Sequence, residues 1–503
     1  MWTHPLTVTL LVLVAIGGGL WFLATRPGIA RGRFSRLLRI STLSARVSTS
    51  WFGSRIRRLF EGKAARARID DAQRVANAQR VADTMGQMKG AFMKLGQMVS
   101  FVTDDVPEAY QQALASLQAS APPMDFALLR DVAESELGQP LERAFARFDP
   151  VPLASASIGQ VHRAQLPDGR EVAVKIQYPG VAEAIMSDLS NAEVLYRVGM
   201  VMYPGVEVGP IIDELRARIG EELDYEREAR NQRAFCDLYR GHPYVRVPEV
   251  VASHSTKRVL TSEFVSGKRW ADVVDPASDP ASRQRYAEIL YRFVFGSITR
   301  FGVFNGDPHP GNYLFDDEGR VVFLDFGCVK YFPPAMRRDW KGLVVAHIAG
   351  DQRLFRELVV RLGFIKDDAP ISAELLYEYF SYFYDPFRLD REFTFNREYN
   401  RMSFGMVFRP TGRFEGMHTR LNMPPDFVFV NRIQWGVVSL LAQLEGTNNW
   451  HRIHQEFVAD APPSTELGRL DAAHREAWRE RAGLPDTELA LTPDGVVALS
   501  SLG

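Results

Sequence analysis

Short apolar runs with alternating polar residues predict β-strands in one part of the chain. Glu171–Ile176 alternates in this way, Asp168-Gly169 just before it is typical of a hairpin turn, and Val259–Gly267 predicts a strand that leads into a linker. These runs lie close together in the sequence, within residues 141–268. The pattern predicts a small lobe built around a β-sheet.

Apolar residues at three- and four-residue steps predict helices elsewhere. Residues 74–101 form one such run, Phe126–Leu137 form another that ends near Gly138, and 281–301 and 336–460 are mostly helical by the same criterion. Together the two patterns predict an α+β fold, with a sheet-containing lobe followed by a larger helical lobe.

One helical stretch is rich in aromatic residues. Its members are Tyr377, Tyr379, Phe380, Tyr382, Phe383, Tyr384 and Phe387. Aromatic side chains at helical spacing are most often packed in a core. A pocket for a lipid or a quinone is the alternative that the sequence leaves open.

The segment from Asn305 to Gly327 carries the most specific chemistry. A Pro/Gly-rich loop holds Asp307 and Asn312, and two short apolar runs predict a hairpin that returns Asp325 beside Asn312. Carboxylate and amide oxygens are the ligands that Mg²⁺ takes when phosphates fill its other positions. Asp307, five residues before Asn312, is placed like the acid that orients or deprotonates a nucleophile in phosphoryl transfer. The combined spacing predicts a kinase-like site rather than an ordinary polar loop.

A small-residue segment upstream predicts the part that covers a nucleotide. The candidate residues are Ala154, Ser155, Ala156, Ser157, Gly159 and Gln160. The segment precedes a strand that ends beside Lys175, as in folds where a loop covers phosphates and a strand lysine holds them. Glu263 and Val265 lie where such a fold offers backbone groups to adenine. Because alanine has fewer backbone conformations than the glycine of protein kinases, this loop is expected to be stiffer.

Two further features of the predicted lobes bear on the activity. A lysine such as Lys175 pairs with a glutamate of the next helix; several acids in 211–235 compete for this role, and spacing does not choose between them. After Gly327 there is no Ala-Pro-Glu, and Gly306 stands where protein kinases have the arginine of His-Arg-Asp. Because a peptide substrate normally lies on the segment after Asp-Phe-Gly, the sequence argues against an ordinary protein kinase.

Composition and charge exclude other classes of protein. The chain has 503 residues, of which 46% are hydrophobic and 24% charged, and its formal net charge is −1. This composition is that of an ordinary globular protein, and it predicts no nucleic-acid partner. Two cysteines, Cys236 and Cys328, cannot form a disulfide framework or a four-ligand zinc site.

The N-terminal region predicts a membrane anchor. Pro5–Ala24 is an uncharged, mostly apolar run of about 20 residues, which is long enough to cross a bilayer as a helix. Met1–Phe60 contains no Asp or Glu, and its arginines all follow the apolar run. By the positive-inside rule, this arrangement predicts a single-pass protein of the bacterial inner membrane whose catalytic body faces the cytoplasm. A mitochondrial presequence, with the mitochondrial inner membrane as the location, is the alternative.

These motifs together resemble the UbiB family of atypical kinase-like proteins, also called the ADCK family, over roughly residues 75–340. The matching motifs are Lys94-x-Gly-Gln97, the Ala-rich loop Ala154–Gln160, Val172-Ala-Val-Lys175, Glu222-x-Asp224-Tyr225-x-Arg-Glu228, Asp307-x4-Asn312 and Asp325-Phe-Gly. The resemblance implies that Lys175 pairs with Glu228 and the phosphates of ATP, that Asn312 and Asp325 hold Mg²⁺, and that Asp307 is the catalytic acid. It also implies that Lys94 and Gln97 reach over the site to Glu222 and Asp224, where they exclude a protein substrate.

The sequence and the resemblance together predict six regions. They are a transmembrane signal anchor (1–25), a basic membrane-proximal segment (26–70), a helical extension with the Lys-x-Gly-Gln motif over the active site (71–140), a kinase-like N-lobe (141–268), a kinase-like helical C-lobe (269–460) and a peripheral C-terminal tail (461–503). Two features depart from the family. Ser155 stands where alanine is more frequent in the family. Bacterial members commonly carry a pair of C-terminal membrane helices, whereas none is predicted here, because the one candidate, Phe427–Leu444, contains Arg432.

The resemblance implies a membrane-anchored ATPase that supports the biosynthesis or handling of ubiquinone or another isoprenoid lipid. Membrane lipids, a ubiquinone precursor or other isoprenoid lipid, and quinone-biosynthesis enzymes would be its partners, and a homodimer is left open. Two alternatives remain at this point: a phosphotransferase that acts on a small molecule or protein, and a nucleotide-binding scaffold without catalysis.

Overall fold

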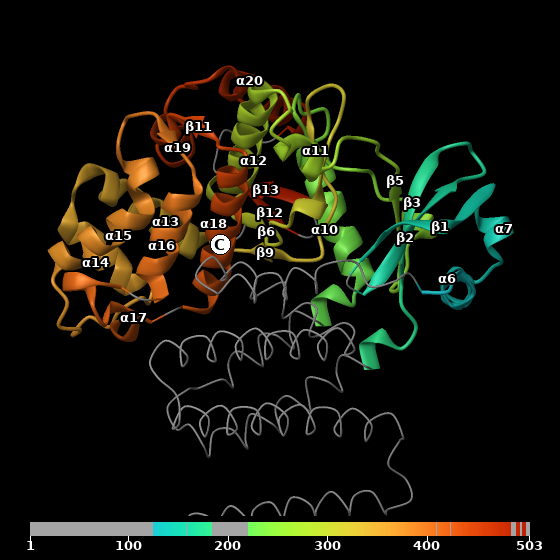
Figure 1. Ribbon diagram of the computed structural model, residues 1–503, viewed down its shortest axis with the longest axis horizontal. Coiled ribbons are helices and arrows are strands. Elements are labelled where there is room, and N and C mark those ends of the chain that lie inside the picture. Colours follow the sequence, from blue (N-terminus) through green and yellow to red (C-terminus); the bar gives the residue numbers. More distant parts are fainter. Residues whose placement is uncertain are drawn as a thin grey trace, which may run out of the picture. The chain divides into compact units, whose positions relative to one another are not determined.

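The computed structural model describes residues 124–156, 158–183, 220–408, 410–422, 424–483, 489–492 and 495–498 (Figure 1). The predicted anchor, the basic segment, most of the helical extension with Lys94 and Gln97, and Ser157 lie outside these residues. Within the described ranges, no helix combines the length and the apolar character needed to span a bilayer. The elements below belong to one compact unit, which includes Pro122–Pro179 and Ala217–Gly503.

The N-lobe is a four-stranded antiparallel sheet in the order β1-β2-β3-β5. Its strands are β1 (Arg147–Ser155), β2 (Gly159–Gln165), β3 (Glu171–Gln177) and β5 (Val259–Glu263). Side chains of β3 alternate between buried and half-buried, so that Val172, Val174 and Ile176 face a small apolar core. Helices α6 (Phe126–Leu137) and α7 (Leu141–Ala144) contribute the other side of that core, and Figure 1 shows both beside the sheet.

Helix α10 (Tyr225–Leu238) lies between the N-lobe sheet and the helical lobe (Figure 1). The Asp224 carboxylate caps it by accepting a hydrogen bond from the Arg227 backbone N–H (3.0 Å). Phe235, near its other end, is fully buried and packs on Phe293 and Phe326 of the helical lobe. One helix therefore contacts both lobes, and its polar residues lie between them.

Helix α12 (Pro280–Phe301) is the central element of the helical lobe, and most of its second half is buried. Asp279 caps its start, and Gly302 ends it in the left-handed conformation (φ 63°). The other helices are α11 (Trp270–Val274), α13 (Pro334–Ala349), α14 (Gln352–Arg361), α15 (Ala373–Arg388), α16 (Arg397–Phe408), α17 (Met417–Arg420), α18 (Pro425–Gln443), α19 (Trp450–Val458) and α20 (Glu466–Ala482). The short strands are β4 (Val245–Arg246), β6 (Val303–Asn305), β7 (Tyr313–Phe315), β8 (Val321–Phe323), β9 (Val329–Tyr331), β10 (Phe393–Thr394), β11 (Thr447–Asn448), β12 (Leu489–Thr492) and β13 (Gly495–Ala498).

Most predicted elements agree with the structure, and one segment differs. The helix predicted over Phe126–Leu137 and the strand predicted from Glu171 are observed. We predicted a loop that includes Ala154 and Ser155, whereas both residues end β1 and pair with β2. Irregular register on either side of Pro152 keeps β1 paired past the proline, so the connection to β2 is only three residues, 156–158.

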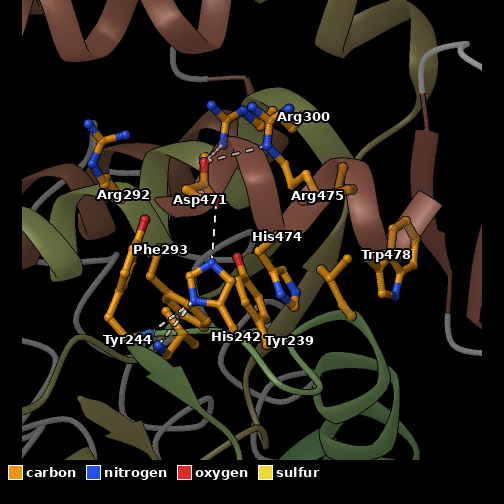
Figure 2. Close-up of a pocket in the computed structure, with 14 residues that line it drawn as sticks. Tyr239, His242, Tyr244, Arg292, Phe293, Arg300, Asp471, His474, Arg475 and Trp478 are labelled. Carbon is orange, nitrogen blue, oxygen red and sulfur yellow. Dashed lines mark hydrogen bonds and ion pairs between the residues drawn. The ribbon is translucent and has the colours of Figure 1, made fainter. Parts of the chain in front are cut away.

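Helix α20 is fastened to α12 and to the loop after α10 through the buried carboxylate of Asp471. Asp471 accepts hydrogen bonds from Arg300 Nη1 (2.5 Å) and from His242 Nε2 (3.3 Å), and Arg475 lies 3.4 Å away (Figure 2). The Nδ1 atom of His242 accepts from the Val245 backbone N–H (3.2 Å), so the ring proton is on Nε2. Burial raises the pKa of Asp471, but the charges of the two arginines outweigh it and hold that pKa far below its usual range.

Replacing Asp471 with asparagine is expected to destabilise the protein by about 3 kcal/mol, because two partly buried guanidinium groups lose their shared carboxylate. A carboxyl with a depressed pKa adds stability that is complete above its unfolded pKa near 4 and is lost gradually as pH falls from there to the folded pKa. Urea unfolding should therefore show a deficit for the variant that is about 1 kcal/mol smaller at pH 3 than at pH 7. Asp237→Asn, at an exposed ion pair with Arg240, is the control, with an expected cost under about 1 kcal/mol. Equal costs at both positions would contradict this view of Asp471.

Candidate active site

The predicted hairpin is present and brings two of the candidate residues together. Strands β7 and β8 pair in antiparallel register, with Tyr313 opposite Phe323. The backbone N–H of Leu324 donates to the carbonyl of Asn312 (3.0 Å), which places Asp325 directly beside the loop that carries Asn312. The strands are apolar and mostly buried, so hydrophobic packing fixes the hairpin while the polar residues lie at its end.

The Asp325 backbone is held by two asparagines. Asn305 Nδ2 donates to the Asp325 carbonyl (2.6 Å), and Asn231 Nδ2, from α10, donates to the Phe326 carbonyl (3.0 Å). The Phe326 ring is fully buried against Phe235. The Gly327 backbone N–H donates to Asp325 Oδ1 (2.9 Å), which orients the carboxylate. Sequence reasoning missed Asn231 and Asn305; their only signal is their place beside the motif residues, three after Glu228 and two before Asp307.

Asp307 and Asn312 are in direct contact. Asn312 Nδ2 donates to the Asp307 carbonyl (3.0 Å) and to Asp307 Oδ2 (3.2 Å). Because the amide nitrogen is used in this way, the amide oxygen is the atom that can face a metal ion. At the start of the same loop, the Gly306 N–H donates to the Cys328 carbonyl (2.6 Å), which ties the loop to the segment after Asp-Phe-Gly.

Lys175 joins the two lobes electrostatically. Its Nζ lies 2.8 Å and 3.0 Å from the carboxylate oxygens of Glu228 on α10, and 3.5 Å from Asp325 Oδ2. Burial opposes the charge on Lys175, but Asp325 and Glu228 outweigh it and hold the pKa of the lysine well above its usual value. Burial raises the pKa of Glu228 to about 7, with Lys175 opposing the shift. Sequence spacing left the partner of Lys175 undecided, and the structure selects Glu228.

Gly159 and Tyr225 shape the wall beside Lys175. A Cβ atom at Gly159 would lie 2.3 Å from the Ile176 carbonyl oxygen and 3.1 Å from the Tyr225 hydroxyl, so no larger residue fits there. The Tyr225 ring lies under the lysine, with Nζ 4.9 Å from the ring centroid. The Ala156 N–H donates to the Gly159 carbonyl (2.8 Å) and closes the β1–β2 connection as a tight turn.

Comparison with known proteins shows the family. The ABC1 atypical kinase-like domain matches residues 116–359. Atypical kinase coq-8, mitochondrial, of Caenorhabditis elegans is 30% identical over 404 residues, which make up 76% of this chain and 51% of that protein. Atypical kinase COQ8, mitochondrial, of Saccharomyces cerevisiae is 27% identical over 450 residues, which cover 86% of each chain. The chain belongs to the UbiB family of atypical kinase-like proteins.

A solved structure supports the kinase-like fold of this UbiB protein. The structure of Rv3197 with erythromycin, from Mycobacterium tuberculosis, has a TM-score of 0.58 and 29% identity, and the match covers 78% of this chain and 98% of that one. The chain spans about half the length of the first curated relatives, 51% of the nematode protein and 44% of COQ8B of Danio rerio. The predicted kinase-like fold with mixed helices and sheets is confirmed.

The remaining candidate residues have varied surroundings. The Glu263 side chain pairs with Arg246 (2.6 Å), so only its backbone remains available as an adenine contact. The Gln160 side chain is fully buried, and its amide oxygen accepts a hydrogen bond from the Met124 N–H. Glu222 and Val265 are half-buried, and Asp224 caps α10. Contacts of Glu222 and Asp224 with Lys94 and Gln97 lie outside the described residues and stay a prediction.

The donor set of the UbiB site fits Mg-ATP. Asn312 and Asp325 offer two oxygen ligands, and Lys175 lies beside Asp325. In the described parts of the chain, no group of three or more His, Cys, Asp or Glu side chains could hold a metal ion by itself. A pair of hard oxygen ligands is what Mg²⁺ needs when the phosphates and water complete its octahedron. Lys175, 16% exposed, can reach a phosphate and still pair with Glu228.

Proposed function

We propose that this protein is an ATPase with a kinase-like fold, which binds Mg-ATP and uses its hydrolysis to support the biosynthesis or handling of ubiquinone or another isoprenoid lipid. The observation that carries the nucleotide part is the Lys175–Glu228 pair, 2.8 Å apart and within 3.5 Å of Asp325. Lys175 contacts both Glu228 and Asp325, and Asn312 contacts Asp307. The lipid part is supported by the relatives, which are named COQ8 and coq-8 atypical kinases.

The residues of the site divide the chemistry among themselves. Bound Mg²⁺ would neutralise charge on the phosphates, with Asn312 and Asp325 as its protein ligands. Lys175 stabilises negative charge that grows on the phosphate oxygens, and Glu228 fixes the lysine in position. Asp307, held by Asn312, orients the attacking oxygen and accepts its proton. Because Asn231 and Asn305 hold the backbone around Asp325, these groups are preorganised before nucleotide arrives.

The membrane part of the proposal rests on the N-terminal sequence and on the relatives. The apolar run at Pro5–Ala24 would hold the catalytic body at a membrane surface. The relatives COQ8 and coq-8 are named as mitochondrial, and another relative, ACTIVITY OF BC1 COMPLEX KINASE 8 of Arabidopsis thaliana, as chloroplastic. A bacterial inner membrane and the mitochondrial inner membrane both fit the proposal. Membrane lipids, an isoprenoid lipid and quinone-biosynthesis enzymes are the partners we propose.

A phosphotransferase is the second candidate, because Asp307 is retained and is hydrogen-bonded to Asn312. The segment after Asp-Phe-Gly favours a small molecule over a protein as the acceptor of the phosphoryl group. Val329–Tyr331, just after this motif, pairs as a strand with Val303–Asn305, so these residues do not form an open segment on which a peptide could lie.

Radioactively labelled ATP decides between these functions. With label in the γ-phosphate, the full chain in liposomes is expected to release labelled inorganic phosphate, at a rate that rises with membrane or with a quinone precursor. Label that accumulates in a lipid, a small molecule or a protein would establish the phosphotransferase. Tight nucleotide binding with no phosphate release and no transfer in any condition would refute both the ATPase and the phosphotransferase. It would leave the nucleotide-binding scaffold without catalysis.

A further inference from the structure

A large cavity in the helical lobe is lined by the end of α12, by α13, by α20 and by the segment that joins α19 to α20. No residue of the nucleotide site lines it. It encloses about 620 Å³, which is within the range of sites that hold small molecules. Four of its fourteen lining residues are basic, namely Arg300, Lys341, Arg475 and Arg479. The cavity is therefore large enough for a ligand, and its walls carry positive charge.

One carboxylate serves two of these arginines. Asp471 binds Arg300 (2.5 Å) and lies 3.4 Å from Arg475, as Figure 2 shows. The Nε atoms of both arginines make no hydrogen bond within the described structure. Burial and the charges of Arg300 and Arg479 lower the pKa of Arg475, and Asp471 offsets this only in part. Because the Arg475 side chain is still 33% exposed, its uncompensated charge can act on a ligand in the cavity.

The two acidic residues of the lining, Glu456 and Asp460, do not neutralise this charge. Both carboxylate oxygens of Glu456 are bound by Arg292 (2.8 Å and 3.2 Å), a buried arginine outside the lining. Asp460 is exposed, so water and salt screen its charge. Lys341 belongs to α13 and Arg475 to α20, so positive groups approach the cavity from two helices. An anion in the cavity would be attracted by both.

Aromatic residues line another part of the cavity. Phe457 is fully buried, and the Arg300 guanidinium lies over its ring, 4.5 Å from the centroid, which fixes the direction of the arginine. Trp478 is half-buried, so part of its indole ring remains available to a ligand. Cations beside aromatic surface suit a ligand in which an anionic group is joined to an apolar one.

We propose that this cavity binds a phosphate monoester dianion joined to an apolar group, with Arg475 and Lys341 on the phosphate and Trp478 beside the apolar group. The planar fork of an arginine matches two phosphate oxygens at once, and several converging cations favour a dianion over a monoanion. A soluble aryl phosphate and the monoester headgroup of a membrane lipid share this chemistry. The site stands apart from the nucleotide site, so the proposal does not depend on the proposed function.

Binding of the phosphate is tested first, by calorimetry on the full-length protein in detergent, without nucleotide or Mg²⁺. We expect phenyl phosphate to bind about ten-fold more tightly than phenyl sulfate, a monoanion of similar shape. Arg475→Met and Lys341→Met should each weaken phenyl phosphate about ten-fold. Lys341→Met keeps the test decisive if Arg475→Met fails to fold, because Arg475 also lies beside the buried Asp471.

Arg338→Met is the matched control for these titrations, since it removes one positive charge from an exposed position of α13 outside the lining. It should bind phenyl phosphate like wild type. No binding of phenyl phosphate to wild type, equal affinity for phenyl sulfate, or wild-type affinity in Lys341→Met would overturn the site.

The apolar group and the source of the phosphate are tested second. Trp478→Ala should lower the preference for phenyl phosphate over methyl phosphate about five-fold while methyl phosphate binds as in wild type; an unchanged preference would overturn the apolar half of the proposal. The titration with phenyl phosphate is then repeated in vesicles of phosphatidic acid, a monoester, and of phosphatidylglycerol, an anionic diester. An affinity that falls only with phosphatidic acid assigns the site to a lipid headgroup, whereas equal affinities assign it to a soluble phosphate.

Discussion

An Asp325→Asn variant is expected to release phosphate from Mg-ATP at least ~100-fold more slowly than wild type. The substitution removes the only carboxylate of the proposed metal ligand pair and weakens the field that holds Lys175. It leaves the local backbone intact, because Asn305 and Asn231 bind the Asp325 and Phe326 carbonyls rather than the Asp325 side chain. The asparagine oxygen can still accept the Gly327 N–H. We therefore expect a free energy of unfolding within about 1 kcal/mol of wild type.

Initial rates over a range of Mg²⁺ concentrations are the measurement, since a damaged metal site is partly rescued at high Mg²⁺. Asp317→Asn, an exposed residue in the turn of the same hairpin, is the matched control and should keep the wild-type rate. A near-normal rate in Asp325→Asn would show that the site does not use Asp325 as a metal ligand.

Lys175→Met is expected to lower phosphate release about 100-fold and also to destabilise the protein. The Glu228 side chain is 2% exposed and loses its cation, and breaking a buried ion pair from one side costs about 3–5 kcal/mol. Glu228 can limit that cost by taking up a proton, because its pKa, already about 7 beside the lysine, rises further without it.

The sign of the pH dependence follows from that raised pKa. A carboxyl whose folded pKa lies above its unfolded value adds stability at low pH and loses it as pH rises through the folded pKa. Urea unfolding should therefore show a larger deficit for Lys175→Met at pH 8 than at pH 6. The double variant Lys175→Met/Glu228→Gln removes the buried charge, so it should recover stability but not turnover. Lys257→Met, at an exposed lysine of the N-lobe, serves as the control; a pH-independent deficit would contradict the argument.

The sequence predicted those parts of the site whose residues are close along the chain. Asp307, Asn312 and Asp325 belong to one loop and one hairpin, so spacing and apolar runs were enough to bring them together. The predicted helix over 281–301 agrees with α12, and the structure adds the capping residues Asp279 and Gly302.

Contacts between distant segments were not predictable in the same way. Glu228 is 53 residues from Lys175, and only the packing of α10 against both lobes distinguishes it from the neighbouring acids. Asn231 carries no motif, yet its bond to the Phe326 carbonyl spans 95 residues. The predicted loop at Ala154 and Ser155 also failed for a tertiary reason, since pairing with β2 outweighs their small-residue character.

The segment after Gly327 has a consequence for how a cell could control this protein. Residues 328–333 contain no serine or threonine. Tyr331, the hydroxyl-bearing residue there, lies in β9 and donates a hydrogen bond to Asn231 Oδ1. In many signalling enzymes an upstream kinase modifies this region and thereby orders it. Here the region is already ordered, so phosphorylation by an upstream kinase is not needed to order it. If the proposed function holds, we expect the rate to follow the supply of small molecules, as in a metabolic enzyme, rather than phosphorylation by an upstream kinase.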